Sequence, residues 1–291
     1  GSHDTMTYCL DKTSAVSDNE SKLVNLLNKC LPCIIHPIIM KWSTTQELSV
    51  TEQLEAGVRY LDLRIAHKAN DPSMNLYFVH MLYTTVTVQD ILCEVLKWLE
   101  SHPQEVVILA CRNFDGLTRS LHCHLVARIK EIFRCKLCPR NVSVRSFSSL
   151  SFFLGDETNP HTPLWRRELL ACTTRDTLSS TVLSEFWKKK KKFFLIVLPK
   201  KYLRCHFLIF FLFVSERFFV AGINLTENLA YILAHPFGSL KKMTLQNLPY
   251  LKIWVKQQYP GPKKECINII AGDFIGNNDF VKDVIELNKK I

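Results

Sequence analysis

The sequence predicts an α/β fold in which strand–helix units repeat along one domain, most simply a (β/α) barrel. From residue 50 to 140, and again from 218 to the end, apolar runs of strand length alternate with longer amphipathic segments. At 291 residues and 47% hydrophobic, the chain can bury one large core. No Gly-rich phosphate loop follows a strand, which favours a barrel over a doubly wound sheet. We therefore predict a single domain over residues 1–291.

The first predicted elements lie between residues 51 and 101. Thr51–Ala56 is expected to be a helix that leads through Gly57 into a strand at Val58–Ile65. A short strand follows at Leu76–His80. The helical spacing of apolar residues in Val88–Ser101 predicts the next helix.

The strand–helix pattern then continues to the end of the chain. Glu105–Cys111 is rich in β-branched residues, which is typical of a strand covered on both faces. After it we expect the helix Leu121–Phe133, the strand Phe218–Ile223, the helix Leu245–Gln258, the strand Ile267–Phe274 and the helix Phe280–Asn288.

Residues 146–217 do not follow this pattern and are interpreted as an atypical or aberrant segment within the domain. The segment is rich in Ser and Thr, then has five lysines at Lys188–Lys192 and aromatic runs such as Phe207–Phe213. The lysines are either a solvated run or a patch for anionic lipid. Residues 188–217 contain nine Lys or Arg and one Glu, so most of the net charge of +10 is local. An evenly basic nucleic-acid binder is therefore not expected.

Cysteine usage and hydropathy predict a cytoplasmic protein. Eleven cysteines without a regular framework fit a reducing compartment. The pairs Cys30/Cys33 and Cys135/Cys138 are far apart and have no His pair at finger spacing, so thiols are expected rather than zinc ligands. Charged residues interrupt the apolar stretch Phe193–Val214, so we predict no transmembrane helix.

Ionisable residues stand where the predicted strands end. Asp62 and Arg64 are two residues apart in one strand and share a face. His80, Arg112 and Asp273 each end an apolar run. Singly, each could be a structural residue, such as a hydrogen-bonded histidine or an ion pair. Together at one barrel mouth they would form an ionic cluster suited to a charged substrate, with arginines fit to clamp a phosphate.

Several motifs in order carry a family resemblance. They are Gly1-Ser-His-Asp-Thr5, Arg59-Tyr-Leu-Asp-Leu-Arg64, Tyr77-Phe-Val-His80, His102-Pro-Gln-Glu-Val-Val107 and Gly272-Asp-Phe-Ile275. These motifs resemble the X domain of phosphatidylinositol-specific phospholipase C (PI-PLC), in particular its eukaryotic X domain-containing group. The resemblance covers residues 1 to about 145 and 218–291, and it implies a distorted (β/α)8 TIM-like barrel of the PI-PLC type.

The resemblance also implies roles for the site residues. His3 is expected to act as general base on the inositol 2-hydroxyl, and His80 as general acid toward the diacylglycerol oxygen. Asp273 would orient His3, and Asp62 would be the partner of His80. Asp4 would support the phosphate and leaving-group region.

No metal or other cofactor is expected. Calcium-dependent relatives have Asn, Asp and Glu at the positions of Asp4, Arg64 and Arg112, whereas this sequence follows the calcium-independent pattern. A fixed guanidinium can neutralise phosphate oxygens in place of a cation, and Arg112 is expected to contact the substrate.

The sequence thus predicts a calcium-independent phosphodiesterase that cleaves phosphatidylinositol at a membrane surface and binds no nucleic acid. Two alternatives stay open at this point. One is a catalytically silent variant that binds phosphoinositide or the membrane surface. The other is a metal-dependent glycerophosphodiesterase, for which the required Glu-rich cluster is missing from the sequence.

Overall fold

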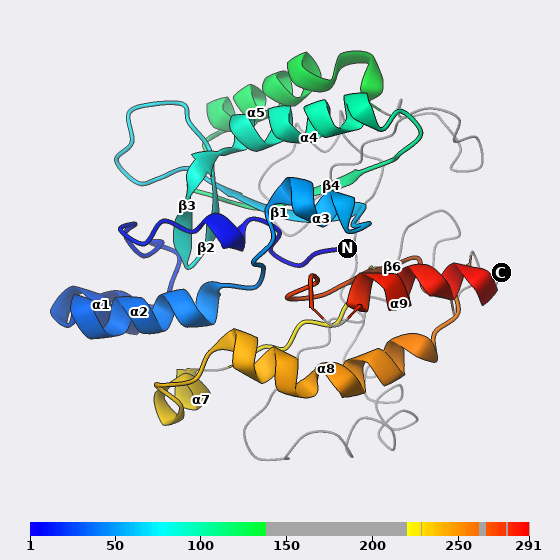
Figure 1. Cartoon of the computed structure of the whole chain (residues 1–291). Coiled ribbons are helices and arrows are strands. Elements are labelled where there is room, and N and C mark those ends of the chain that lie inside the picture. Colours follow the sequence, from blue (N-terminus) through cyan, green and yellow to red (C-terminus); the bar gives the residue numbers. More distant parts are fainter. Residues whose placement is uncertain (138–219, 228, 262–265, 278, 291) are drawn as a thin grey trace, which may run out of the picture.

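The computed structural model describes residues 1–137, 220–227, 229–261, 266–277 and 279–290 (Figure 1). The predicted atypical segment 146–217, with its lysine run and its interrupted apolar stretch, lies outside the described residues. Within the described ranges, no helix combines the length and the hydropathy that crossing a membrane requires.

The larger sheet has four strands in the order β3-β2-β1-β4. β1 (Tyr60–Ala66) is parallel to β4 (Ile108–Asp115), whereas β2 (Tyr77–His80) is antiparallel to both β1 and β3 (Leu82–Thr87). The predicted strands at β1 and β2 are confirmed to within two residues at each end, and the one at β4 begins three and ends four residues later than predicted. β3 was not predicted, and it makes β2 and β3 a hairpin.

A second sheet pairs β5 (Val220–Gly222) with β6 (Ile269–Ala271) in parallel. The first residues of the chain join the two sheets, because Ser2 forms parallel bridges to Leu61 in β1 and to Gly272 after β6. The parallel order is therefore β4, β1, residues 1–3, β6 and β5. The α/β class is confirmed. A closed barrel is not shown by the described strands, which form an open arc.

Helices lie on two opposite sides of the molecule (Figure 1). α4 (Val88–Ser101) and α5 (Arg119–Phe133) lie on one side of the molecule, and α8 (Leu240–Lys256) and α9 (Phe280–Glu286) lie on the other. The described residues also form several short elements, which are α3 (Val50–Glu55), α7 (Leu229–Ala234) and the 3-10 turns η1 (Thr7–Cys9), η2 (Arg134–Lys136) and η4 (Leu287–Lys290).

Two helices precede α3 and were not predicted. α1 (Lys22–Cys30) and α2 (Pro32–Ser43) form a helical hairpin at the edge of the molecule (Figure 1). Ser21 caps α1 through its side chain, which accepts a hydrogen bond from the Val24 N–H. Pro32 starts α2 at the first helical position, where its missing N–H is not needed.

Alternation along β1 separates the core from the site. Leu61, Leu63 and Ile65 are fully buried and belong to the main apolar core, where each contributes about 2 kcal/mol of hydrophobic stabilisation. Because side chains of a strand alternate, Asp62 and Arg64 point to the opposite face. The same residues that build the core thereby fix where the two charged side chains lie.

Candidate active site

Strand register brings three site residues to one level. Ser2 aligns with Leu61 on one side and with Gly272 on the other. One residue further along each parallel segment stand His3, Asp62 and Asp273, which therefore share one face of the arc. Two residues beyond Asp62, Arg64 is the register partner of Arg112 on β4, so both guanidinium groups reach the same face.

His3 is held at both ring nitrogens. Its Nδ1 lies 2.8 Å from Asp273 Oδ1, and its Nε2 lies 2.8 Å from Arg64 Nη2. Because arginine can only donate and the carboxylate can only accept, this geometry fits a neutral imidazole with the proton on Nδ1 and with the Nε2 lone pair accepting from Arg64. Burial lowers the pKa of His3, but the carboxylates of Asp4 and Asp273 outweigh it, so its pKa lies above the ordinary 6.5.

His80 faces His3 across the site. The two ring centroids are 6.5 Å apart. His80 Nδ1 lies 2.6 Å from the Ser43 carbonyl oxygen at the end of α2. Since a carbonyl only accepts, Nδ1 carries a proton and Nε2 is the atom turned toward the site. There Nε2 lies 3.5 Å from Asp4 Oδ2.

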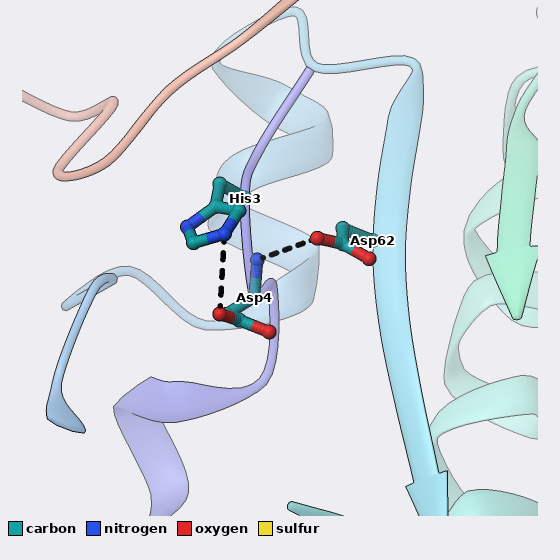
Figure 2. A group of neighbouring side chains, drawn as sticks. All are labelled: His3, Asp4 and Asp62. Carbon is teal, nitrogen blue, oxygen red and sulfur yellow. Dashed lines mark hydrogen bonds and ion pairs between the residues drawn. The ribbon is translucent and has the colours of Figure 1, made fainter. Parts of the chain in front are cut away.

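Asp4 lies between the two histidines and contacts both of them. Its Oδ2 lies 3.3 Å from His3 Nε2 and 3.5 Å from His80 Nε2, and its Oδ1 forms an ion pair with Arg64. Figure 2 shows the side chains of His3, Asp4 and Asp62 turned toward one another from the N-terminal segment and β1. Burial raises the pKa of Asp4, but Arg64 and both histidines outweigh it, so the pKa lies below its usual value and the group is ionised.

Asp62 has a different partner from the one predicted. Its Oδ1 lies 2.8 Å from Arg112 Nε, and its Oδ2 accepts the Asp4 N–H at 3.3 Å. Arg112 also donates to the Tyr60 hydroxyl at 3.1 Å. The carboxylate that faces His80 is that of Asp4, so the predicted Asp62–His80 pairing is replaced by an Asp4–His80 pairing. The reason is that Asp4 has a positive φ of 43°, which turns its side chain inward between the rings.

The structure thus brings together all seven predicted site residues. The carboxylates of Asp4, Asp62 and Asp273 are almost fully buried, whereas the rings of His3 and His80 keep 16% and 22% of their surface exposed. A substrate that approaches from outside therefore meets imidazole and guanidinium groups first. The acids behind them set their orientation and charge.

Backbone turns of unusual conformation follow four of these residues. Asp4 after His3, Met81 after His80, Asn113 after Arg112 and Phe274 after Asp273 all have positive φ values, from 43° to 69°. A left-handed backbone costs about 1 kcal/mol or more in a residue other than glycine. Such strain clusters where a fold aims side chains at a site, which supports a functional role for this cluster.

Gln46 anchors the segment that carries His3. This buried side chain donates from Nε2 to the carbonyl oxygens of His3 and Gly272, at 2.8 and 2.9 Å, and its Oε1 accepts the Ile275 N–H at 3.3 Å. It therefore holds the N-terminal segment against the strand end that carries Asp273. Nothing in the sequence singles it out, because its partners are backbone atoms.

We expect Gln46→Leu to lower the free energy of unfolding by about 2–3 kcal/mol, because buried polar groups lose their partners while the side-chain volume is kept. Urea unfolding of the variant would measure this. Gln89→Leu, at an exposed position of α4, serves as the control and should stay within about 0.5 kcal/mol of the parent. An equal stability of the two variants would show that Gln46 does not tie the segment down.

Other polar residues around the site were also missed. Glu227 follows β5, at the same end of the parallel strands, and burial raises its pKa to about 7. Its charge interacts with Asp273 and His3. Burial also raises the pKa of Glu20 and Asp115, which interact with His80 and Arg64 respectively. The rule that found Asp273 could have found Glu227, since both follow parallel strands.

Among the described residues, His3, Asp4 and Asp62 offer ligand atoms within 4.8 Å of one another. These residues do not fit a divalent cation well, because Arg64 lies against Asp4 and Arg112 against Asp62. Each guanidinium neutralises a carboxylate that a cation would need, and a cation beside two of them would be repelled. We therefore derive no catalytic step from a metal.

Comparison with known proteins gives close relatives. The family model described as PI-PLC X 1 matches residues 39–128. The chain is 51% identical to the human "PI-PLC X domain-containing protein 1", over 100% of this chain and 86% of that protein. It is 44% identical to the mouse protein of the same name, over 100% of this chain and 81% of that protein.

Solved structures with the same fold include bacterial enzymes. The phosphatidylinositol-specific phospholipase C from Listeria monocytogenes superimposes with a TM-score of 0.55 at 15% identity, over 99% of this chain and 91% of that one. A phosphatidylinositol-specific phospholipase C from S. aureus, from work on its membrane binding, gives a TM-score of 0.56 at 13% identity, over 99% and 90% of the two chains. At this identity the likeness concerns the fold alone.

Proposed function

The chain belongs to the PI-PLC X domain-containing protein family, and from this membership we propose that it is a metal-independent phosphodiesterase acting on phosphatidylinositol at membrane surfaces, with a cytoplasmic location. The single observation that carries the proposal is the placement of the two histidines. His3 Nε2 and His80 Nε2 face each other across one carboxylate oxygen of Asp4, while each Nδ1 is fixed by an acceptor behind it. Two imidazoles so placed suit general acid–base catalysis on a phosphodiester.

In the proposed first step, His3 Nε2 takes the proton of the inositol 2-hydroxyl as that oxygen attacks phosphorus. The bond between phosphorus and the glycerol oxygen breaks, and His80 Nε2 gives its proton to the departing oxygen. Diacylglycerol leaves, and a cyclic inositol phosphate remains. Asp273 stabilises the imidazolium that forms on His3, as a carboxylate does behind other catalytic histidines.

In the second step the histidines exchange roles. His80 Nε2 takes a proton from water as the water oxygen attacks phosphorus, the bond between phosphorus and the inositol 2-oxygen breaks, and His3 Nε2 returns its proton to that oxygen. Arg64 lies within hydrogen-bond distance of His3 and in an ion pair with Asp4, so it can reach a phosphate oxygen placed between the rings. Its fixed positive charge would stabilise the phosphorane-like transition state. Arg112 would contact the phosphate or the inositol hydroxyls.

The proposal is tested by incubating phosphatidylinositol vesicles with the full chain in excess chelator and following water-soluble products by phosphorus NMR. We expect product to form in chelator because the proposed mechanism uses no cation. The cyclic phosphodiester signal should appear first and the acyclic phosphate signal later, because ring opening is the second step. The blank is the double variant His3→Ala/His80→Ala. Products that appear only after calcium addition would contradict metal independence, and a folded chain that binds vesicles without forming product would favour a silent phosphoinositide binder.

A further inference from the structure

The α1–α2 hairpin has an apolar outer surface that no described part of the chain covers. α1 is amphipathic, yet none of its residues is buried. Leu23, Leu26, Leu31 and Ile34 are between 49% and 59% exposed. These four are a large share of the exposed large hydrophobics in the described structure, and they lie within twelve consecutive positions. Apolar side chains exposed together within one short segment indicate an interaction surface.

The inner face of the hairpin explains why the outer leucines are not needed for folding. Val24, Ile35 and Met40 pack against a satellite core that contains Leu10 and Leu82. The hairpin therefore has its own apolar contacts on the side that faces the protein. Its outer leucines add nothing to that core and are free to meet a partner.

The charge of the hairpin indicates the chemistry of that partner. Residues 21–46 contain Lys22, Lys29 and Lys41 and no Asp or Glu. At helical spacing Lys22, Leu26 and Lys29 fall on one face of α1, and all three are exposed. Leucines flanked by lysines suit an interface with apolar chains below and anionic headgroups above.

The hairpin is also fixed to the edge of the site. Its last residue, Ser43, provides the carbonyl that holds His80. Before its first residue, the Ser17 N–H donates to the carbonyl of Met81, the neighbour of His80. The Asn25 side chain donates to the carbonyl oxygens of Ser17 and Glu20. A partner surface that binds the hairpin would therefore lie next to His80.

From these observations we propose that the outer face of α1–α2, formed by Lys22, Leu23, Leu26, Lys29, Leu31 and Ile34, docks the protein onto an anionic lipid bilayer. This inference rests on the proposed function, because docking would bring the active site to a substrate that is part of the membrane. Burial of the leucines and contact of the lysines with anionic headgroups each favour the bound state. Binding is expected to weaken as salt rises, because the lysine contribution is screened.

The test is flotation of the full chain with phosphatidylcholine vesicles, with and without phosphatidylserine. We expect Leu26→Ser/Ile34→Ser and Lys22→Gln/Lys29→Gln each to lower partitioning onto phosphatidylserine vesicles by about tenfold. Matched controls remove the same residue types elsewhere. Tyr250→Ser/Ile253→Ser changes exposed positions of α8, and Lys97→Gln/Lys282→Gln changes exposed positions of α4 and α9. Both controls should partition like the parent.

Three results would overturn the docking proposal: no partitioning of the parent chain, equal loss in the controls, or hairpin variants that keep partitioning but lose self-association. Cleavage of a short-chain, monomeric phosphatidylinositol separates this proposal from the function itself. Hairpin variants should cleave the monomeric substrate like the parent and lose only vesicle cleavage. Hairpin-dependent binding without any cleavage would sustain docking while contradicting the proposed enzyme.

Discussion

Replacement of His80 by alanine is expected to lower the rate of inositol phosphate release by about 10²- to 10⁴-fold. In the proposed mechanism His80 Nε2 gives its proton to the leaving oxygen, because its Nδ1 is already committed to the Ser43 carbonyl. His3, across the site, takes up a proton in this step, and Asp4 between the two rings is ionised, so neither can donate in place of His80. Without the ring, the glycerol oxygen would leave as an unprotonated alkoxide.

His3→Ala should cause a loss of the same order, because it removes the base that activates the inositol hydroxyl. The double variant should be little worse than either single variant, since the two rings act as one unit and losing either stops the proton transfer. Steady-state release from vesicles measures all three. His124→Ala, on α5 away from the site, is the matched control. Single variants that lose less than about tenfold would exclude the acid–base pair.

The sequence could locate this site because most of it obeys strand geometry. Arg64, Arg112 and Asp273 were found by the rule that parallel strands deliver their carboxyl ends to one edge, and β1, β4 and β6 are parallel. His80 satisfies the rule only by coincidence. It arrives on the antiparallel strand β2 and reaches the site because the chain reverses immediately after it.

What the sequence could not predict depends on backbone conformation and on backbone partners. The reversal at Met81 needs a left-handed conformation in a residue other than glycine, for which there is no sequence signal. The same holds for Asp4, whose inward turn gives it the contact with His80 that was assigned to Asp62. Gln46 and the Ser43 carbonyl act through main-chain hydrogen bonds, which residue types do not reveal.

Asp4→Asn is expected to lower product release by about 10²-fold, although the side chain keeps its size. The carboxylate is the only group in the described structure in an ion pair with both histidines, and it also balances Arg64. An amide cannot stabilise the imidazolium that forms on His3, nor the proton held on His80 for the leaving group. The guanidinium of Arg64 would then face His3 with only its longer ion pair, 3.9 Å to Asp62, as counter-charge.

The pH dependence of Asp4→Asn distinguishes this electrostatic role from a merely structural one. His3 works as a base only when neutral. Asp4 and Asp273 raise the pKa of His3 above 6.5, so the midpoint of the acid limb of kcat/KM in the parent should lie above pH 6.5. Removing one carboxylate lowers that pKa, so the acid limb should move to lower pH in Asp4→Asn and stay in place in Glu100→Gln, an exposed control on α4. A slower enzyme with an unshifted limb would mean that Asp4 only shapes the turn. A shifted limb would mean that the buried carboxylate of Asp4 sets the proton affinity of His3, the proposed base. The same carboxylate lies 3.5 Å from His80, the proposed acid, so one group would then act on both partners of the proton transfer.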